Sequence, residues 1–378
     1  MKKLYVIIFL FSFSEIISQS IKIGETFTIT SEILKETREY YVYTPESYSS
    51  EEAYPIIYVL DGDEYFMMMA SAVRYFANRG FMPKSIVVGI DNSDHRDRDL
   101  TPTSDNYSPT GGGAENFLSF LTEELMPSMA SKYKIKPHST LFGASYGGLF
   151  VLNTLFTQPN SFDNYIAISP SIFHDNGLIF QEGLQFFKKN NTDRKFVFLS
   201  LADEAWSEMR IHFKNTVQLF KNNANSANIR WHYSFYDEET HETTKLRGIN
   251  DGLRKLHEFW FVPFYQRYRG AEGLIEHFEM LNEQYGYEIS ISEKLVNRIA
   301  YNNLREGKIK QAKSLFQYNV DNFPSSANAY DSYGEFFEKQ GINDEARKYY
   351  KLAIKAAKET NKNSALYEKN LNRVKEKM

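Results

Sequence analysis

The sequence predicts an α/β protein with a mainly parallel sheet, helices on both faces of that sheet, and a small all-α region at the C-terminus. Between residues 54 and 265, short apolar runs of strand length alternate with segments of helical pattern, which is typical of this class. After about residue 290 the pattern is helical and repeats, with 34 residues from Gly307 to Gly341. The 378 residues exceed the usual size of one domain, so we expect two.

Composition narrows the class of protein further. The chain is 42% hydrophobic and 24% charged, which favours a globular protein with a large core. A formal net charge of −4 argues against a nucleic-acid partner, which requires a basic surface. The absence of cysteine excludes disulfides, a thiolate nucleophile and cysteine-based metal sites.

Residues 1–18 have the pattern of a secretory signal peptide. Two lysines follow Met1, and the almost wholly apolar run that comes next, residues 4–13, is about half the length needed to span a bilayer. We therefore expect an exported protein, periplasmic or secreted, with no membrane span once this segment is removed.

The strands and helices follow from the periodicity of apolar residues. Alternating threonines and apolar residues predict two antiparallel strands between residues 24 and 43. Further strands are expected at 54–62, 85–90, 139–142, 165–168, 195–201 and 229–236. Helices are expected at 66–78, 114–133, 149–156, 209–222 and 252–265. Residues 91–113 are polar and rich in proline and glycine, which predicts a long functional loop, a lid or a pocket wall.

The stretch Gly143-Ala144-Ser145-Tyr146-Gly147 is the candidate catalytic motif. It reads Gly-x-Ser-x-Gly, the pattern of a nucleophile elbow, in which a serine occupies a tight turn between a strand and a helix. Alone, the pattern also fits a glycine-rich turn without catalysis. Its flanks have the required strand and helix patterns, so Ser145 is a candidate nucleophile.

A serine hydroxyl needs a neighbouring base, and that base needs an orienting acid. Of the eight histidines, only His241 follows the end of a predicted strand and lies in a loop. The strand that ends at residue 201 is followed by Asp203 and Glu204. Adjacent side chains point in different directions, so only one of these acids can reach His241, and the pattern leaves both open.

Acyl transfer also requires N–H donors for the oxyanion. One candidate is the backbone N–H of Tyr146, which follows the serine. The other lies in the turn Asp61-Gly62-Asp63 after the strand at 54–62.

Over residues 24–265 the chain resembles the putative-esterase branch of the α/β-hydrolases, which includes esterase D, feruloyl esterases, mycolyltransferases and ferric-siderophore esterases. The matching motifs are Tyr58-Val59-Leu60-Asp61-Gly62, the stretch from Arg96 to Pro102, Gly143 to Gly148, Ile168-Ser169-Pro170-Ser171 and Glu239-Thr240-His241. The resemblance implies the α/β-hydrolase fold, with Ser145 as nucleophile and His241 as base. It favours Glu204 as the acid and, from the mycolyltransferases, the N–H of Asp63 as second oxyanion donor.

The resemblance also suggests a substrate. Siderophore esterases of this branch act on bulky, iron-loaded catecholate lactones, and Arg96 and Arg98 in the long loop are candidate contacts for such an anion. The alternative is that both arginines pair with nearby aspartates (Asp94, Asp97 and Asp99). Serine hydrolysis needs no cofactor, and no metal motif is visible.

The expected organisation is a signal peptide over 1–18, an esterase domain over 19–270, a linker helix over 271–289 and helical repeats over 290–378. The repeats resemble tetratricopeptide repeats, and we expect them to pack on the catalytic domain or bind a protein partner. The predicted function is an exported serine carboxylester hydrolase. An acyltransferase with the same triad and a non-catalytic binding protein are the alternatives.

Overall fold

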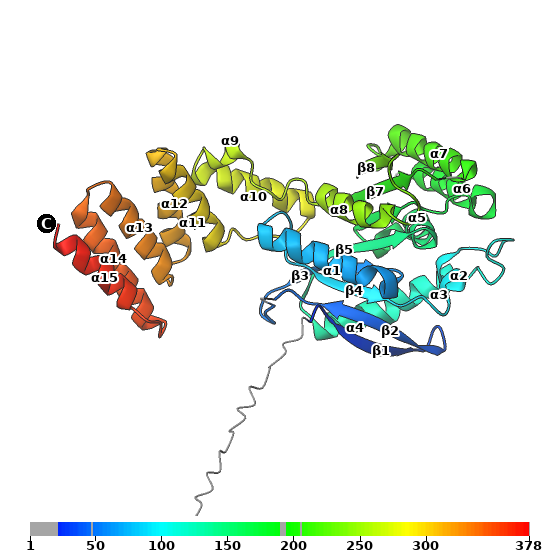
Figure 1. The fold of residues 1–378 in the computed structure, drawn as a ribbon, viewed down its shortest axis with the longest axis horizontal. Helices are drawn as coiled ribbons and strands as arrows, with labels where there is room; N and C mark the ends of the chain where they lie inside the picture. The colour runs from blue at the N-terminus through cyan, green and yellow to red at the C-terminus, as the bar shows by residue number, and fades with distance from the viewer. Residues whose placement is uncertain (1–21, 47, 190–193, 205, 378) are drawn as a thin grey trace, which may run out of the picture.

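The computed structural model describes residues 22–46, 48–189, 194–204 and 206–377. The predicted signal peptide lies outside these residues. The described chain contains an eight-stranded sheet with the order β1-β2-β4-β3-β5-β6-β7-β8, followed by a helical region (Figure 1). No helix within the described ranges is both long and apolar enough to cross a membrane.

The sheet is parallel from β4 to β8, and β1 and β2 are antiparallel additions at one edge. Four strands of the parallel part, β3, β4, β6 and β7, are buried along their whole length, which explains why their sequences are largely apolar. The predicted mainly parallel sheet is confirmed. The strands are β1 Glu25–Ser31, β2 Glu36–Tyr43, β3 Tyr54–Val59, β4 Ile86–Ile90, β5 Ile135–Ala144, β6 Asn164–Ile168, β7 Lys195–Ala202 and β8 Ile229–Tyr236.

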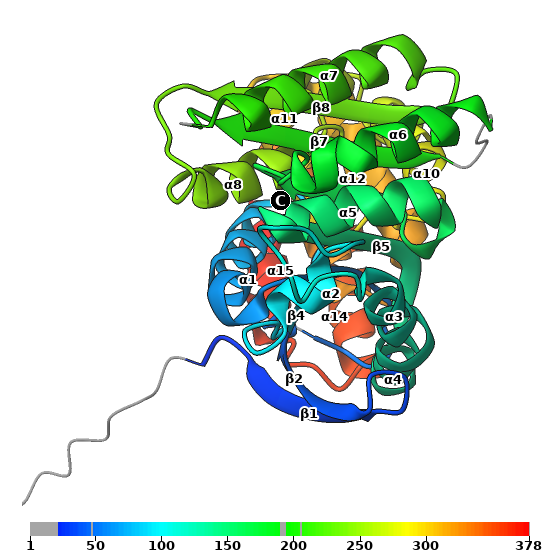
Figure 2. The same ribbon diagram turned by 90° about the vertical axis from the view of Figure 1, so that its right-hand side faces the viewer.

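Helices cover both faces of the sheet, as predicted (Figure 2). On one face, α1 Gly62–Arg79 and α8 Thr244–Leu256 enclose one apolar core. On the other face, a larger core lies beneath α3 Ala114–Ser119, the π-helical turn Phe120–Leu125, α4 Met126–Lys132, α5 Tyr146–Thr157, α6 His174–Lys188 and α7 Ser207–Asn223. The two cores hold the carboxyl ends of the parallel strands in fixed relative positions.

The helix expected over residues 252–265 is wrong in its bounds. The structure has α8 over Thr244–Leu256, immediately after the loop that carries His241, and a separate short helix α9 over Phe264–Arg267. Gly248 is inside α8 because the helix approaches β6 closely, and a Cβ there would lie 2.6 Å from Ile168 Cδ1. A residue with a side chain at this position would prevent the close packing of α8 on β6.

Two further elements differ from expectation. The long loop over 91–113 contains a short helix, α2 Arg96–Leu100. Helix α6 was not expected, and its first turn contains Asp175, Asn176 and Gly177 with left-handed backbone angles. A regular helical pattern does not begin until after these residues, which explains why the sequence did not reveal the start of α6.

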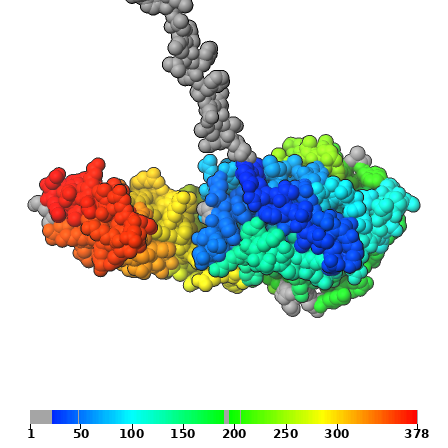
Figure 3. Space-filling model, turned by 90° about the horizontal axis from the view of Figure 1, so that it is seen from below, coloured from blue at the N-terminus to red at the C-terminus, as the bar shows by residue number. Residues whose placement is uncertain are grey.

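The C-terminal region has its own apolar core. The predicted period appears as two helical pairs, and Gly307 (φ 74°) and Gly341 (φ 72°) take the left-handed conformation in the turn within each pair. Figures 1 and 3 show this region at one end of the molecule, away from most of the sheet. Its helices are α10 Ala271–Tyr285, α11 Glu293–Arg305, α12 Ile309–Asn322, α13 Ala327–Lys339, α14 Asn343–Glu359 and α15 Ala365–Lys375.

The helical region meets the sheet at the start of β5. The Tyr285 hydroxyl donates to the Leu256 carbonyl oxygen over 3.0 Å, and the His138 ring lies 5.4 Å from the rings of both Tyr285 and Tyr287. Ser145 follows the opposite end of the same strand. The helical region therefore docks near the amino end of β5, whereas the elbow lies at the carboxyl end of that strand.

This junction predicts a pH dependence of stability. Burial lowers the pKa of His138 to about 4. The positive charge of Arg230 also lowers this pKa, whereas the negative charge of Asp163 raises it. A histidine with a lowered folded pKa contributes stability above its ordinary pKa of about 6.5, and that stability is lost as the pH falls to about 4. We expect the free energy of unfolding to fall by up to about 3 kcal/mol from this residue over that interval.

Thermal melts between pH 7 and pH 4 test this expectation with His138→Gln, which keeps an acceptor for the Asn164 amide. The variant should show a shallower loss of Tm, although buried His257, whose pKa is lowered by burial too, keeps part of the slope. Replacement of the more exposed His95 by glutamine is the control. Identical slopes for wild type and His138→Gln would contradict the prediction.

Candidate active site

Ser145 occupies a strained turn between β5 and α5. Its backbone angles are φ 56° and ψ −118°, which a non-glycine residue rarely adopts. The turn is so tight that a Cβ at Gly143 would lie 2.3 Å from the Gly147 carbonyl carbon. The Ser145 N–H donates to the Ile168 carbonyl oxygen, and its own carbonyl oxygen accepts from the Ser171 N–H. The glycines of the motif thus serve the geometry that exposes a serine at a strand end.

The structure brings Glu204 and His241 together at the ends of neighbouring strands. His241 Nδ1 lies 3.0 Å from Oε1 and 3.1 Å from Oε2 of Glu204. Glu204 is only 6% exposed. Burial alone would raise the pKa of Glu204, but the hydrogen bond and the charge of His241 outweigh it and leave the pKa below its usual value. An ionised Glu204 fixes the proton on Nδ1 and leaves Nε2 of His241 free.

Asp203 is directed elsewhere. Its side chain forms an ion pair with Arg210 and is 56% exposed, while its backbone N–H donates to the Glu239 carbonyl oxygen over 3.0 Å. This backbone bond ties the turn after β7 to the loop after β8, which positions Glu204 against His241. The two acids left open by the sequence therefore have different partners in the structure.

The loop that carries His241 is held by two threonines. The Thr240 N–H donates to Thr243 Oγ1 over 2.9 Å, and the Thr243 N–H donates to Thr240 Oγ1 over 3.2 Å. In the described chain the Ser145 hydroxyl hydrogen-bonds to the Ser171 hydroxyl, 3.3 Å away, rather than to His241. Hydrogen bonds between nucleophile and base are often loose without substrate, and rotation about Cα–Cβ redirects a serine hydroxyl.

The two candidate oxyanion donors both lie in the first turn of a helix. Tyr146 is the first residue of α5, and Asp63 is the second residue of α1. N–H groups at these positions have no carbonyl partner within their helix, and the helix dipole favours negative charge beside them. Asp61, which precedes α1, adopts a left-handed conformation with φ 51°. Two helix N-termini thus supply N–H groups on either side of the strand ends.

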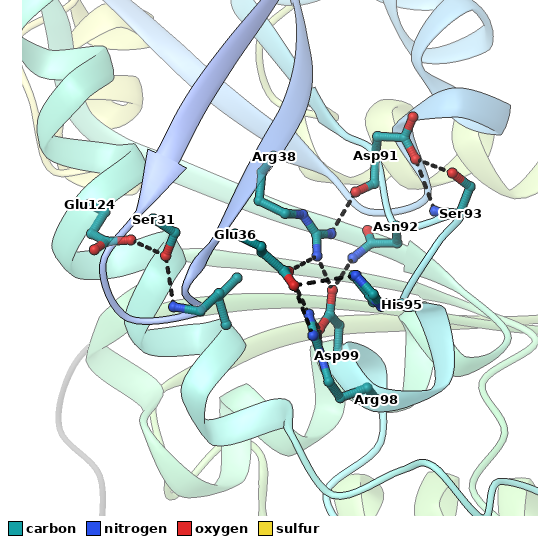
Figure 4. A network of polar contacts seen from close by, with 11 residues as sticks. Ser31, Glu36, Arg38, Asp91, Asn92, Ser93, His95, Arg98, Asp99 and Glu124 are labelled. Atoms are coloured by element: carbon teal, nitrogen blue, oxygen red, sulfur yellow. Dashed lines mark hydrogen bonds and ion pairs between the residues drawn. The ribbon is translucent and has the colours of Figure 1, made fainter.

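The two candidate arginines have different environments. Arg96 forms a two-pronged ion pair with Asp61, and its guanidinium lies 5.5 Å from the centre of the Tyr146 ring. Arg98 instead binds Glu36 over 2.6 and 3.0 Å and Asp99 over 2.8 Å (Figure 4). The hydrogen bonds from Arg98 lower the pKa of Glu36 to about 2. Arg96 borders the elbow, whereas Arg98 belongs to a polar network beneath β2.

An aromatic cluster that the sequence did not reveal lies close to these residues. The rings of Phe173 and Trp206 are 4.7 Å apart, and Tyr107 packs on both at 5.9 and 5.4 Å. Tyr107 and Trp206 are exposed. The cluster draws on three separate segments, and the only signal is that Phe173 and Trp206 each come two residues after a residue of the site, Ser171 and Glu204.

A mainly parallel sheet, a serine on the strand-to-helix turn and an acid–histidine pair at later strand ends define a protein of the α/β-hydrolase fold. The chain belongs to the family described as "Putative esterase", whose model matches residues 31–247.

Similar proteins include enzymes that act on siderophores. The ferri-bacillibactin esterase BesA of Bacillus subtilis is 37% identical over 182 residues, which are 41% of this chain and 63% of that protein. The siderophore enterobactin esterase of Emericella nidulans is 35% identical over 154 residues, 34% of this chain and 50% of that protein. The matches thus span between half and just under two thirds of these relatives.

Solved structures extend the comparison. An IroE-like serine hydrolase from Shewanella oneidensis has a TM-score of 0.68 and 27% identity and covers 79% of this chain and 99% of its own. An uncharacterised protein from Capnocytophaga ochracea, at 20% identity and a TM-score of 0.65, covers 93% of this chain and 99% of its own. The second likeness shows shared fold alone, and its coverage extends into the helical region.

Proposed function

We propose that the protein is a serine carboxylester hydrolase that works through Ser145, His241 and Glu204. The observation that carries this proposal is the 3.0 Å contact between Glu204 and His241 Nδ1, at the same edge of the sheet as the strained turn that exposes Ser145. A buried, ionised carboxylate bonded to Nδ1 is what a general-base histidine requires, because it leaves Nε2 free to accept a proton.

The reaction proceeds in two halves. Ser145 Oγ attacks the ester carbonyl carbon while its proton passes to His241 Nε2, and Glu204 stabilises the imidazolium that forms. The N–H groups of Tyr146 and Asp63 receive the developing oxyanion. His241 then gives its proton to the leaving alkoxide, which yields an acyl-enzyme on Ser145. In the second half, water activated by His241 attacks the acyl group and restores the serine.

The substrate we propose is a bulky ester of the siderophore type. Two of the similar proteins are esterases of siderophores, which supports this class. The aromatic cluster of Tyr107, Phe173 and Trp206 supports it as well, because exposed rings near the acid and the elbow offer a large apolar contact. We also propose that the protein acts outside the cytoplasm, on the basis of the signal-peptide pattern of residues 1–18.

Trapping of the acyl-enzyme tests the mechanism. The purified protein is mixed with p-nitrophenyl acetate, quenched in acid and digested, and the peptides are analysed by mass spectrometry. We expect a burst of about one p-nitrophenol per protein molecule and an acetyl group on the peptide that contains Ser145. Acetylation confined to another residue, or turnover without any acetylated peptide, would rule out Ser145 as the nucleophile.

A further inference from the structure

The buried carboxylate of Asp61 forms an ion pair with Arg96, whose side chain is 32% exposed, between the two turns that carry the proposed oxyanion donors. Arg96 Nε donates to Asp61 Oδ1 over 2.9 Å, and its Nη2 donates to Oδ2 over 3.0 Å. Such a two-pronged pair fixes the relative orientation of its partners as well as their separation. Asp61 is 3% exposed and directly precedes α1, and Arg96 begins α2.

The same ion pair contacts the nucleophile elbow. Arg96 Nη2 lies 3.4 Å from the carbonyl oxygen of Ala144, the residue before the serine, and the guanidinium faces the Tyr146 ring at 5.5 Å. On the other side of the elbow, a Cβ placed on Gly147 would lie 3.3 Å from Asp61 Oδ2. The ion pair therefore contacts the elbow before Ser145 and leaves little room for a side chain at Gly147 after it.

Asp61 is also anchored away from the elbow. Its N–H donates to Asn92 Oδ1 over 3.0 Å, and the Asn92 amide donates to Asp99 over 3.3 Å. Asp99 in turn accepts from Arg38 over 2.7 Å (Figure 4). This chain of hydrogen bonds connects the turn after β3 to β2 and α2, which makes its position rigid.

Stability alone does not account for an aspartate at position 61. The left-handed backbone disfavours most non-glycine residues by roughly 1 kcal/mol or more, and asparagine and aspartate tolerate it best. Burial opposes the charged form and raises the pKa of Asp61 to about 6, although Arg96 acts against this shift. Asparagine would satisfy the same turn without a buried charge. The carboxylate thus has a role that the turn itself does not require.

We propose that the Asp61–Arg96 ion pair is a positioning device that holds the N–H groups of Asp63 and Tyr146 at the separation required by the oxyanion. Asp63 is two residues from Asp61, and Tyr146 is two residues from Ala144, so each contact of the pair acts on one donor through a short stretch of backbone. Both are positioning residues, since they act through the backbone of the donors. The inference rests on the proposed ester hydrolysis.

Kinetics of Asp61→Asn and Arg96→Lys test the proposal with p-nitrophenyl acetate, an uncharged substrate that offers an arginine no anionic group. Loss of one oxyanion donor costs about 10²- to 10³-fold in kcat. We expect misplaced donors to lower kcat by ~10²-fold and to change KM by less than about threefold. The double variant should be no worse than the worse single variant, because both substitutions break one pair.

A trifluoromethyl ketone provides a second readout, because it forms an oxyanion adduct with the serine. Its inhibition constant should rise by the same factor by which kcat/KM falls, since both depend on the donors. The Arg96→Lys substitution keeps the positive charge but cannot form the two parallel hydrogen bonds of a guanidinium. It therefore tests whether the orientation of the pair matters beyond the neutralisation of Asp61. A change in KM alone, or an unchanged inhibition constant, would overturn the inference.

Arg230→Gln is the matched control for general destabilisation. Arg230 lies on β8, is largely buried and forms an ion pair with Glu258 over 3.0 Å. It contacts neither the elbow nor α1. We expect this variant to lower Tm with kcat unchanged. Folded Asp61→Asn and Arg96→Lys proteins with wild-type kcat would overturn the positioning role, whereas turnover that survives Ser145→Ala would instead overturn the proposed function.

Discussion

Replacement of Ser145 by alanine is expected to lower kcat for p-nitrophenyl esters by at least about 10⁴-fold. Without Oγ no acyl-enzyme forms, and the remaining rate comes only from the N–H donors and from substrate binding. The substitution removes one hydroxyl that contacts Ser171 and leaves the backbone of the elbow in place. Initial rates at saturating substrate, with a thermal melt to confirm the fold, provide the measurement.

Ser200→Ala is the control for the loss of a hydroxyl. Ser200 is fully buried on β7, its Oγ has no hydrogen-bond partner in the described structure, and its side chain has no proposed part in catalysis. We expect this variant to keep the wild-type rate. Equal rates for wild type and Ser145→Ala would show that hydrolysis uses another nucleophile.

The sheet could be predicted from sequence because its central strands are buried on both faces. Strands such as β7 are largely apolar, with only Lys195 and Ser200 as polar residues, and their alternation with helices indicates parallel pairing. The neighbours of each strand could not be predicted. β3 does not pair with β2, and β4 occupies the position between them later in the chain. No local sequence pattern predicts that order.

In the candidate site, too, features set by consecutive residues could be predicted, whereas contacts between residues distant in sequence could not. The strand-to-helix turn depends on five consecutive residues, so its position in the chain could be predicted. The partner of Arg96 could not, because it is Asp61, 35 residues earlier, rather than one of the aspartates beside it in sequence. Adjacent acids were equally ambiguous, since the direction of Asp203 depends on Arg210 in the helix that follows.

Glu204→Gln is expected to lower kcat by about 10³- to 10⁴-fold, the second-largest effect among these predictions. Glutamine preserves the size of the side chain, but its amide can donate to Nδ1 of His241 and so stabilise the tautomer that carries its proton on Nε2. That tautomer cannot accept the serine proton, and the loss from such a change in a serine–histidine–acid triad is about 10⁴-fold. KM should change little, because Glu204 is buried beneath His241.

Asp203→Asn separates this effect from a general loss of negative charge near His241. Asp203 is the adjacent acid on the same turn, but its carboxylate faces solvent and Arg210. Its substitution should weaken only an exposed ion pair, which is worth about 1 kcal/mol or less, and kcat should remain within about threefold of wild type. If Asp203→Asn reduced kcat as strongly as Glu204→Gln, the acid of the triad would have to be reassigned, because only a direct contact with Nδ1 selects the tautomer.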